Sequence, residues 1–245
     1  MIQNSFIFLD KISKKTENNL HKQGIKTWDD FLNAKNIKGI SKPRKIFCDR
    51  KILEARKALY RLDSSYFTGK LPQSETYRLY PFFKDQAVFL DIETEGVDKH
   101  DDITMIGMFD GINTKTMIRG INLDISCLKK ELTNYKLLVT FNGSSFDIPF
   151  LKKRYPGLIP NIPHLDLKTL CQRLGLKGGL KQIEKKFNIK RSRIVEGLYN
   201  GDPLALWKMY RATGDDYYLN LLVEYNEEDV MSLKIIADKL IKDND

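Results

Sequence analysis

The chain of 245 residues contains only three cysteines, Cys48, Cys127 and Cys171, and no Cys-x-x-Cys pair. This scarcity argues against a disulfide framework and against a cysteine zinc site, and it favours a reducing compartment such as the cytoplasm. No run of about 18 or more apolar residues occurs, so we expect no membrane-spanning helix and no membrane partner. The Gly-x4-Gly-Lys-[Ser/Thr] pattern of triphosphate-binding loops is missing as well, which argues against that class of enzyme.

Acidic residues are scarce in the first third of the chain. Residues 1–84 hold 18 Lys and Arg against 8 Asp and Glu, a net charge of +10, whereas residues 85–245 hold 23 basic and 24 acidic side chains. A positive excess favours a polyanionic partner, because each neutralised phosphate releases counterions. A solvated lysine-rich surface explains the same charge, so the charge alone leaves both interpretations open.

Residues 1–65 show the periodicity of short amphipathic helices. The apolar positions that recur at helical intervals are Ile12, Leu20, Ile25, Trp28, Phe31 and Leu32. Another helix is predicted from Ile46 to Leu62, and residues 64–85 then carry the Gly, Pro and Ser residues typical of turns. We therefore expect an all-α module at 1–65, a linker at 66–85 and a second domain at 86–245.

The pattern changes at Ala87, where an apolar run predicts a buried strand leading into Asp91-Ile92-Glu93. Further strands are expected at 103–109, 116–121 and 137–141. Helices are expected at about 123–132, 146–155, 180–187, 203–211 and 217–240. Strands in hairpin order, followed by a helix and another strand, indicate a mixed α/β sheet with helices on its faces.

Four carboxylates occupy positions where a charge is costly unless it has a role. Asp91 and Glu93 stand at i and i+2 of a strand, so they project from one face and repel each other unless a cation lies between them. Asp147 falls in the first turn of a helix that follows the last strand, and Asp229 follows Tyr225 by four residues on one helix face. Taken singly, each is also explained as a strand-end acid, a helix-start acid or half of a Tyr–Asp packing pair.

Together the four acids resemble the ligand set of the DEDD superfamily of 3′–5′ exonucleases, in the branch whose last motif carries a tyrosine. The motifs that carry this resemblance are Phe89-Leu90-Asp91-Ile92-Glu93-Thr94, Phe141-Asn142-Gly143-Ser144-Ser145-Phe146-Asp147 and Tyr225-Asn226-Glu227-Glu228-Asp229. Their order along the chain is that of the superfamily.

A closer similarity, over roughly residues 86–242, is to the YprB-type ribonuclease H-like proteins. It rests on the segments His164-Leu165-Asp166-Leu167, Gly179-Leu180-Lys181-Gln182-Ile183-Glu184, Asn188-Ile189-Lys190-Arg191 and Trp207 to Tyr210 before Thr213-Gly214-Asp215. This resemblance implies a ribonuclease H-like mixed five-stranded sheet flanked by helices.

The resemblance also implies two divalent cations, Mg²⁺ or Mn²⁺, held by oxygen ligands. Asp91 would bridge both ions, Glu93 and Asp229 would complete one site, and Asp147 would hold the other. Such ions activate water, neutralise the phosphate and stabilise the leaving oxygen. Tyr225 would orient the attacking water, because a phenol with an ordinary pKa near 10 is a poor base at neutral pH.

Weaker candidates surround these motifs. Thr94, Asn142 and Phe146 are candidates for contacts to a terminal nucleotide, with core packing as the alternative for Phe146. Asp166 is a candidate for supporting the metal ligands, or else a strand-end cap. A basic strip, read as a track for the substrate backbone or as a solvated helix face, is formed by Lys168, Arg173, Lys177, Lys181, Lys185, Lys186, Lys190, Arg191 and Arg193.

The N-terminal module resembles helix-hairpin-helix or SAM-like modules around Lys38-Gly39-Ile40-Ser41-Lys42. The backbone amides of this segment are predicted to bind a phosphate at a helix start, supported by Lys42, Arg44 and Lys45. A simple packing extension of the second domain explains the module nearly as well.

These observations predict a metal-dependent 3′–5′ exonuclease that acts on single-stranded DNA or RNA with a free 3′ end, with DNA slightly favoured. A structure-selective endonuclease of the same superfold and a non-catalytic nucleic-acid-binding adaptor are the alternatives. An adaptor is expected to lose a metal carboxylate, and all four are present here. The sequence carries no indication of oligomeric state.

Overall fold

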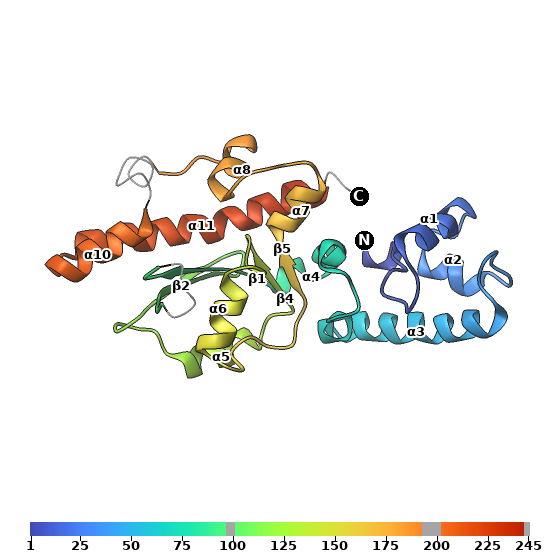
Figure 1. The fold of residues 1–245 in the computed structure, drawn as a ribbon. Coiled ribbons are helices and arrows are strands. Elements are labelled where there is room, and N and C mark those ends of the chain that lie inside the picture. Colours follow the sequence, from blue (N-terminus) through green and yellow to red (C-terminus); the bar gives the residue numbers. More distant parts are fainter. Residues whose placement is uncertain (97–100, 193–201, 243–245) are drawn as a thin grey trace.

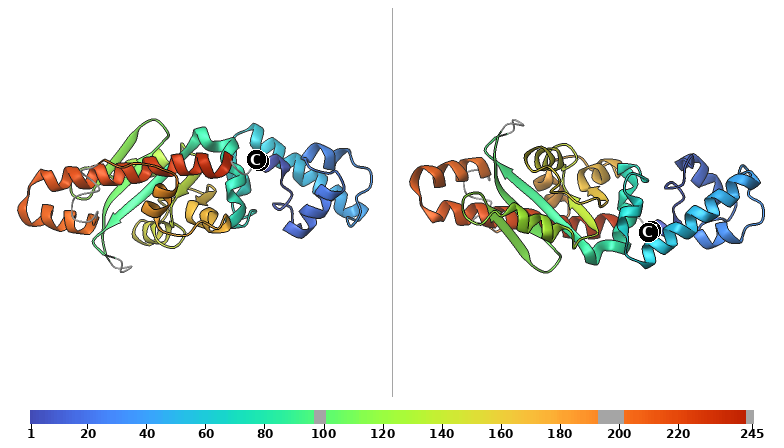
Figure 2. Two further views of the ribbon diagram at one scale, coloured as in Figure 1. Left: turned by 90° about the horizontal axis from the view of Figure 1, so that it is seen from above. Right: turned by 90° about the horizontal axis from the view of Figure 1, so that it is seen from below.

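The computed structural model describes residues 1–96, 101–192 and 202–242. A helical N-terminal region lies at one end of the molecule, and a sheet crossed by a long C-terminal helix lies at the other (Figure 1). Views from above and from below show the same elongated arrangement, with the N-terminal helices beyond the end of the sheet (Figure 2). Within the described residues no helix is both long and apolar enough to cross a membrane.

The N-terminal region is helical, as predicted. Its elements are η1 (Ile2–Asn4), α1 (Lys14–Lys22), α2 (Trp28–Asn33), α3 (Lys42–Tyr60) and η2 (Ser64–Phe67). Thr27 caps α2 because its side chain accepts a hydrogen bond from the amide of Asp30, whose carboxylate bonds back to the Thr27 amide. Trp28 is buried, and its indole nitrogen donates to the carbonyl of Ser5 at 2.8 Å.

The segment predicted as a linker, residues 66–85, is folded against the rest of the molecule. It forms η3 (Gln73–Leu79), α4 (Tyr80–Phe83) and the start of η4 (Lys84–Gln86), and Leu79, Tyr80 and Phe83 are buried. Proline and glycine mark turns, but they do not report whether the turns pack against a core. The division of the chain into two domains at this segment stays a prediction.

Charged groups join the N-terminal region to the rest of the molecule. The guanidinium of Arg78 contacts the carboxylate of Glu17 in α1 at 2.8 Å and that of Glu75 at 2.7 Å. Arg173 contacts Glu75 at 2.8 Å from the other side. Because Glu17 and Glu75 are almost fully buried, these ion pairs fix the N-terminal helices on the 73–79 segment.

The sheet has five strands in the order β3-β2-β1-β4-β5. The strands are β1 (Ala87–Thr94), β2 (Ile103–Phe109), β3 (Thr114–Ile118), β4 (Leu137–Thr140) and β5 (His164–Asp166). β1, β2 and β3 pair antiparallel, whereas β1–β4 and β4–β5 pair parallel. The predicted mixed five-stranded sheet is confirmed.

Helices cover both faces of the sheet. They are α5 (Ile125–Leu132), α6 (Asp147–Arg154), α7 (Leu167–Arg173), α8 (Leu180–Lys186), α10 (Pro203–Thr213) and α11 (Asp216–Lys242). In β1, Val88, Leu90 and Ile92 face the side of α5 and α6, while Ala87 and Phe89 face the side of α11. The central strand is therefore buried on both faces, as its unbroken apolar run predicts.

Candidate active site

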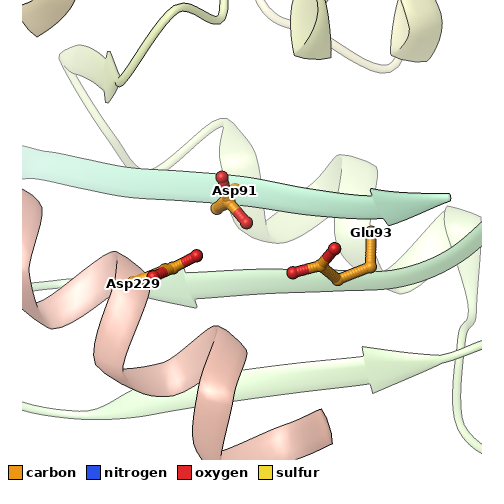
Figure 3. Close-up of side chains that lie close together, drawn as sticks. All are labelled: Asp91, Glu93 and Asp229. Carbon is orange, nitrogen blue, oxygen red and sulfur yellow. The ribbon is translucent and has the colours of Figure 1, made fainter. Parts of the chain in front are cut away.

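The position of Asp91 and Glu93 follows from the alternation of side chains along β1. Ala87 and Phe89 pack beneath α11, so the next residues of the same parity, Asp91 and Glu93, project toward α11 as well. The strand runs from an apolar half under the C-terminal part of the helix to an acidic half under its middle. Figure 3 shows both carboxylates on this side of the strand.

Helix α11 brings Asp229 to these two acids. Leu233, Ile236 and Leu240 of α11 are buried in the core that contains Ala87 and Phe89, which fixes the rotation of the helix. Asp229 lies one turn before Leu233 and faces the acidic half of β1 (Figure 3). One carboxylate oxygen from each of Asp91, Glu93 and Asp229 lies within 4.8 Å of the others.

Asp147 approaches the same region from α6. Its Oδ1 accepts a hydrogen bond from the amide of Ile92 at 3.1 Å. Ile92 follows Phe89, the last residue of β1 that pairs with β4. The buried Asp147 is not among the three acids whose oxygens converge, yet its charge is close enough to raise the pKa of Asp91. The structure thus brings three predicted acids together and places the fourth against the backbone between two of them.

The loop before Asp147 is held by Asp166. This buried carboxylate accepts hydrogen bonds from the backbone amides of Asn142 at 2.9 Å, Ser144 at 3.0 Å and Lys168 at 3.0 Å. Asp166 therefore caps the start of α7 and orders residues 142–144, which set the position of Asp147.

Asn226 belongs to this site, although the sequence alone gives it no role. It is fully buried, and its Nδ2 donates to Oδ2 of Asp91 at 3.1 Å. It fits there because Gly107 of β2, which pairs with Asp91, leaves space: a Cβ at Gly107 would lie 1.8 Å from Oδ1 of Asn226. The available signal was the glycine within a mostly apolar strand, which marks a close approach of another group.

We predict that Gly107→Ala lowers activity by about tenfold or more, because the new methyl displaces Asn226 and shifts α11 by a fraction of an ångström. Steady-state kinetics and thermal melts measure the effect. Gly179→Ala is the matched control, since its Cβ would meet nothing within 4 Å. Wild-type kinetics in Gly107→Ala would show that Asn226 does not set the geometry of Asp91.

A family model of the RNase H superfamily matches residues 88–241. The chain belongs to the RNase H superfamily. No curated protein matches it. A similar solved structure is the family B DNA polymerase from the hyperthermophilic archaeon Pyrobaculum calidifontis, with a TM-score of 0.51 and 17% sequence identity. The similarity covers 63% of this chain and 24% of the polymerase chain, so it concerns the fold, and this chain matches about a quarter of that protein.

The superfamily and the fold point to a nuclease, a hydrolase of phosphodiester bonds. The ribonuclease H-like fold is therefore confirmed, whereas membership of the tyrosine branch and of the YprB-type group stays a prediction. RNase H-like nucleases use divalent metals. The residues of this member fit such ions, because three carboxylates, the hard oxygen donors that Mg²⁺ and Mn²⁺ prefer, converge where Arg191 pairs with only one of them, Asp229.

The electrostatics of the acids show this repulsion directly. Burial, and next the neighbouring carboxylates, raise the pKa values of Asp91 and Glu93 well above their ordinary range. Burial raises the pKa of Asp147 to about 7 and, against the opposing charge of Arg191, that of Asp229 to about 6. A cation among these acids would favour their charged forms and reverse these shifts.

Arg191 faces this RNase H-like site and does not extend toward solvent. Its guanidinium is almost fully buried, contacts both oxygens of Glu184 at 2.8 Å, and contacts Oδ1 of Asp229. The sequence predicts Arg191 in a basic strip that tracks the substrate backbone or forms a solvated helix face. In the structure it links α8 to α11 and restrains the orientation of the Asp229 carboxylate.

Tyr225 and Lys181 flank the acids. Tyr225 is buried one turn before Asp229, and burial together with the negative charge of Asp229 raises the pKa of its phenol. The ammonium of Lys181 lies 4.9 Å from the centre of the Tyr225 ring, and its positive charge partly opposes the rise in the pKa of Glu93 that burial causes. Lys181 is thus a member of the predicted basic strip that lies close to the acidic site.

The remaining candidates near the site have mixed environments. The hydroxyl of Thr94 donates to the carbonyl of Gly96, and Oδ1 of Asn142 accepts from Lys168 at 3.2 Å. Phe146 is half-buried against Phe150, with ring centres 5.1 Å apart. The last candidates are Lys185, which is exposed on α8, and Arg193, which lies outside the described residues.

Two of the three cations predicted to bind phosphate in the N-terminal module make contacts within that module. Arg44 donates to the carbonyl of Asp10 at 2.9 Å, and Lys45 pairs with Asp49 at 2.7 Å. Lys42 is exposed in the first turn of α3. These three residues lie in the N-terminal region, beyond the end of the sheet, and not beside the acidic site (Figure 1).

Proposed function

We propose that this RNase H superfamily member is a metal-dependent 3′–5′ exonuclease that hydrolyses single-stranded nucleic acid, with DNA favoured over RNA. The observation that carries the proposal is the convergence of Asp91, Glu93 and Asp229 from β1 and α11. Asp147 lies against the backbone between the two strand acids and supports the same conclusion. Without a bound cation, burial and mutual repulsion disfavour the charged forms of these acids.

Asp91, Glu93 and Asp229 would hold one divalent ion, and Asp147 together with Asp91 would hold a second. Bound Mg²⁺ or Mn²⁺ supplies an activated water and neutralises charge on the phosphate and on the leaving oxygen. The protein's part is to fix the carboxylates before metal arrives. Asn226 restrains Asp91 by a hydrogen bond. Arg191, which is held in place by Glu184, restrains Asp229.

Tyr225 acts in this proposal as a group that orients water. The raised pKa keeps its phenol protonated at neutral pH, so it does not abstract the proton. Lys181 of α8 lies beside the Tyr225 ring and supplies a positive charge for a substrate phosphate. Thr94, Asn142, Phe146 and Lys185 are the proposed further contacts to the strand.

We expect Tyr225→Phe to lower kcat by about ten- to a hundredfold with little change in KM, because only the alignment of water is lost. The pH–rate profile keeps its shape, since no titrating group is removed. Tyr217→Phe on the exposed side of α11 is the matched control. A Tyr225→Phe profile that loses its alkaline limb would identify the phenol as a titrating acid or base instead.

The activity is tested with DNA and RNA strands labelled at the 5′ or the 3′ end, with Mg²⁺, Mn²⁺ or EDTA. We expect a ladder of products from 5′-labelled single strands that shortens from the 3′ end only with metal. Circular and 3′-blocked strands distinguish the alternatives. Cleavage of the circle would indicate a structure-selective endonuclease, and binding without cleavage of any substrate would indicate an adaptor.

A further inference from the structure

Helix α3 presents large apolar side chains to solvent at regular spacing. Ile46, Leu53 and Tyr60 follow one another at seven-residue intervals and are 68%, 53% and 91% exposed. Seven residues are close to two turns of helix, so the three side chains form a stripe along one face. Isolated exposed apolar residues are ordinary, but a periodic stripe of this length marks a contact surface.

The opposite face of α3 is the one that holds the fold together. Cys48, Ile52, Ala55 and Leu59 are buried there, in the core that contains Trp28 of α2. Figure 1 and the right-hand view of Figure 2 show α1 and α2 on one side of α3, with no described element covering the other. Stability of the chain therefore gives no reason for the apolar stripe.

Positive charge accompanies the stripe. Arg50 and Lys57 are exposed and stand between the apolar residues, four positions after Ile46 and Leu53, and Lys42 lies on the same face. The acids of α3 lie toward its flanks and are already paired, Asp49 with Lys45 at 2.7 Å and Glu54 with Lys51 at 2.7 Å. The exposed face of α3 thus combines three apolar side chains with three cations.

We propose that the exposed face of α3, formed by Lys42, Ile46, Arg50, Leu53, Lys57 and Tyr60, docks an acidic amphipathic helix of a partner protein. A helix with apolar residues at heptad spacing packs along Ile46, Leu53 and Tyr60, while its flanking carboxylates meet the three cations. The heptad spacing of the apolar side chains and the positive charge beside them together favour an acidic amphipathic helix as the partner.

Two other occupants fit the face less well. A nucleic-acid strand would use the cations, but the aliphatic side chains of Ile46 and Leu53 offer no ring on which a base stacks. A second copy of this chain would oppose cation to cation across the contact, which costs free energy. An acidic helix uses both the apolar and the charged side chains.

The face is remote from the acidic site, which lies under the middle of α11 at the other part of the molecule (Figure 1). A partner bound on α3 therefore leaves the acids accessible. The N-terminal region would tether the nuclease to another protein and thereby select where it acts. The ion pairs of Arg78 with Glu17 and Glu75 would hold the tethered face and the sheet together.

The test uses the full chain and a fluorescent synthetic peptide of about three heptads, with Leu at the first and fourth position of each heptad and Glu at the flanking positions. We expect fluorescence anisotropy to give a Kd of about 10–100 µM that weakens with added salt. A peptide with Lys in place of Glu should bind at least about tenfold more weakly, because it meets like charge on the face.

Variants locate the contact. Ile46→Ser with Leu53→Ser, and separately Lys57→Glu, should each weaken peptide binding by about tenfold or more while leaving nuclease activity unchanged. Ile112→Ser is the control, since Ile112 is 85% exposed in the turn between β2 and β3. Equal binding of the two peptides, no binding of either, or unchanged affinity in the double variant would overturn the proposal. So would a double variant that loses single-stranded DNA binding and keeps the peptide.

Discussion

Asp91→Asn is expected to abolish metal-dependent hydrolysis and, at the same time, to stabilise the metal-free protein. The amide keeps the shape of the carboxylate and still accepts the hydrogen bond from Asn226, but it removes one negative charge from the acid cluster. Activity should fall by about 10³-fold or more, which corresponds to about 4 kcal/mol of lost transition-state stabilisation. Relief of the repulsion should raise the Tm by about 2–4 °C for each kcal/mol gained.

Opposite changes in activity and stability distinguish a functional cluster from a structural one. Asp85→Asn is the matched control, because Asp85 is exposed just before β1 and contacts none of the four acids in the described structure. Kinetics and melts of both variants in EDTA and in Mg²⁺ supply the comparison. Retained activity in Asp91→Asn, or a lower Tm in EDTA, would show that the charge of Asp91 has a different role.

The second large effect is the dependence of the metal-free protein's stability on pH. Burial raises the pKa of Asp147 to about 7 and that of Asp229 to about 6, whereas an unfolded aspartate has a pKa of about 3.9. Below pH of about 4 both states hold these protons. Between about 4 and 7 the folded state keeps protons that the unfolded state releases, so the free energy of unfolding falls as pH rises.

Metal should oppose this loss at pH 7–8, because ions bound among the acids stabilise their charged forms. The half-buried His164 works in the other direction below pH of about 6.5, since partial burial lowers its pKa to about 4. Comparison of the wild type with Asp147→Asn cancels the contribution of His164. The difference between the two proteins isolates the acidic site.

Urea unfolding of both proteins at pH 5 and pH 8, with EDTA or with Mg²⁺, measures the prediction. In EDTA the wild type should lose on the order of 2 kcal/mol more than Asp147→Asn over this range, and Mg²⁺ should remove most of that difference. Parallel pH curves for the two proteins in EDTA would show that the carboxyl of Asp147 titrates normally in the folded state.

Much of the fold could be predicted from the sequence, because the local pattern of apolar residues matches the side chains that are buried in the structure. The apolar run at Ala87 predicted a strand buried on both faces, and the i, i+2 spacing predicted that Asp91 and Glu93 share a face. The helix expected at 217–240 is α11, which extends by one residue at its start and two at its end. The predicted ends of the elements were less accurate: β3 begins and ends earlier than the predicted strand 116–121, at Thr114–Ile118.

Features that depend on contacts between distant segments were not accessible. Strand β5, His164–Asp166, has three residues, too few for a periodic signal. The fit of Asn226 over Gly107 joins residues 119 positions apart, and no local pattern reports it. By sequence, Arg191 belongs to a basic strip. In the structure it is buried, because it forms ion pairs with Glu184, seven residues earlier, and with Asp229 on another helix.

The N-terminal region illustrates the same limit. Breaker residues correctly mark the turns of residues 66–85, yet the burial of Leu79 and Phe83 joins this segment to a core that runs from Ile2 to Ile241. Removing residues 1–64 would therefore expose apolar surface as well as remove positive charge. Point variants on the exposed face of α3 avoid that complication.

The central claim is that four carboxylates distant in the sequence meet to bind divalent metal. Anomalous diffraction from crystals soaked in Mn²⁺ tests it most directly. We expect anomalous density within bonding distance, about 2.0–2.3 Å, of carboxylate oxygens of Asp91, Glu93 and Asp229, with a second peak beside Asp147 and no peak at either position in Asp91→Asn crystals. Well-ordered acids with no manganese between them, at concentrations that saturate any nuclease activity, would contradict the account.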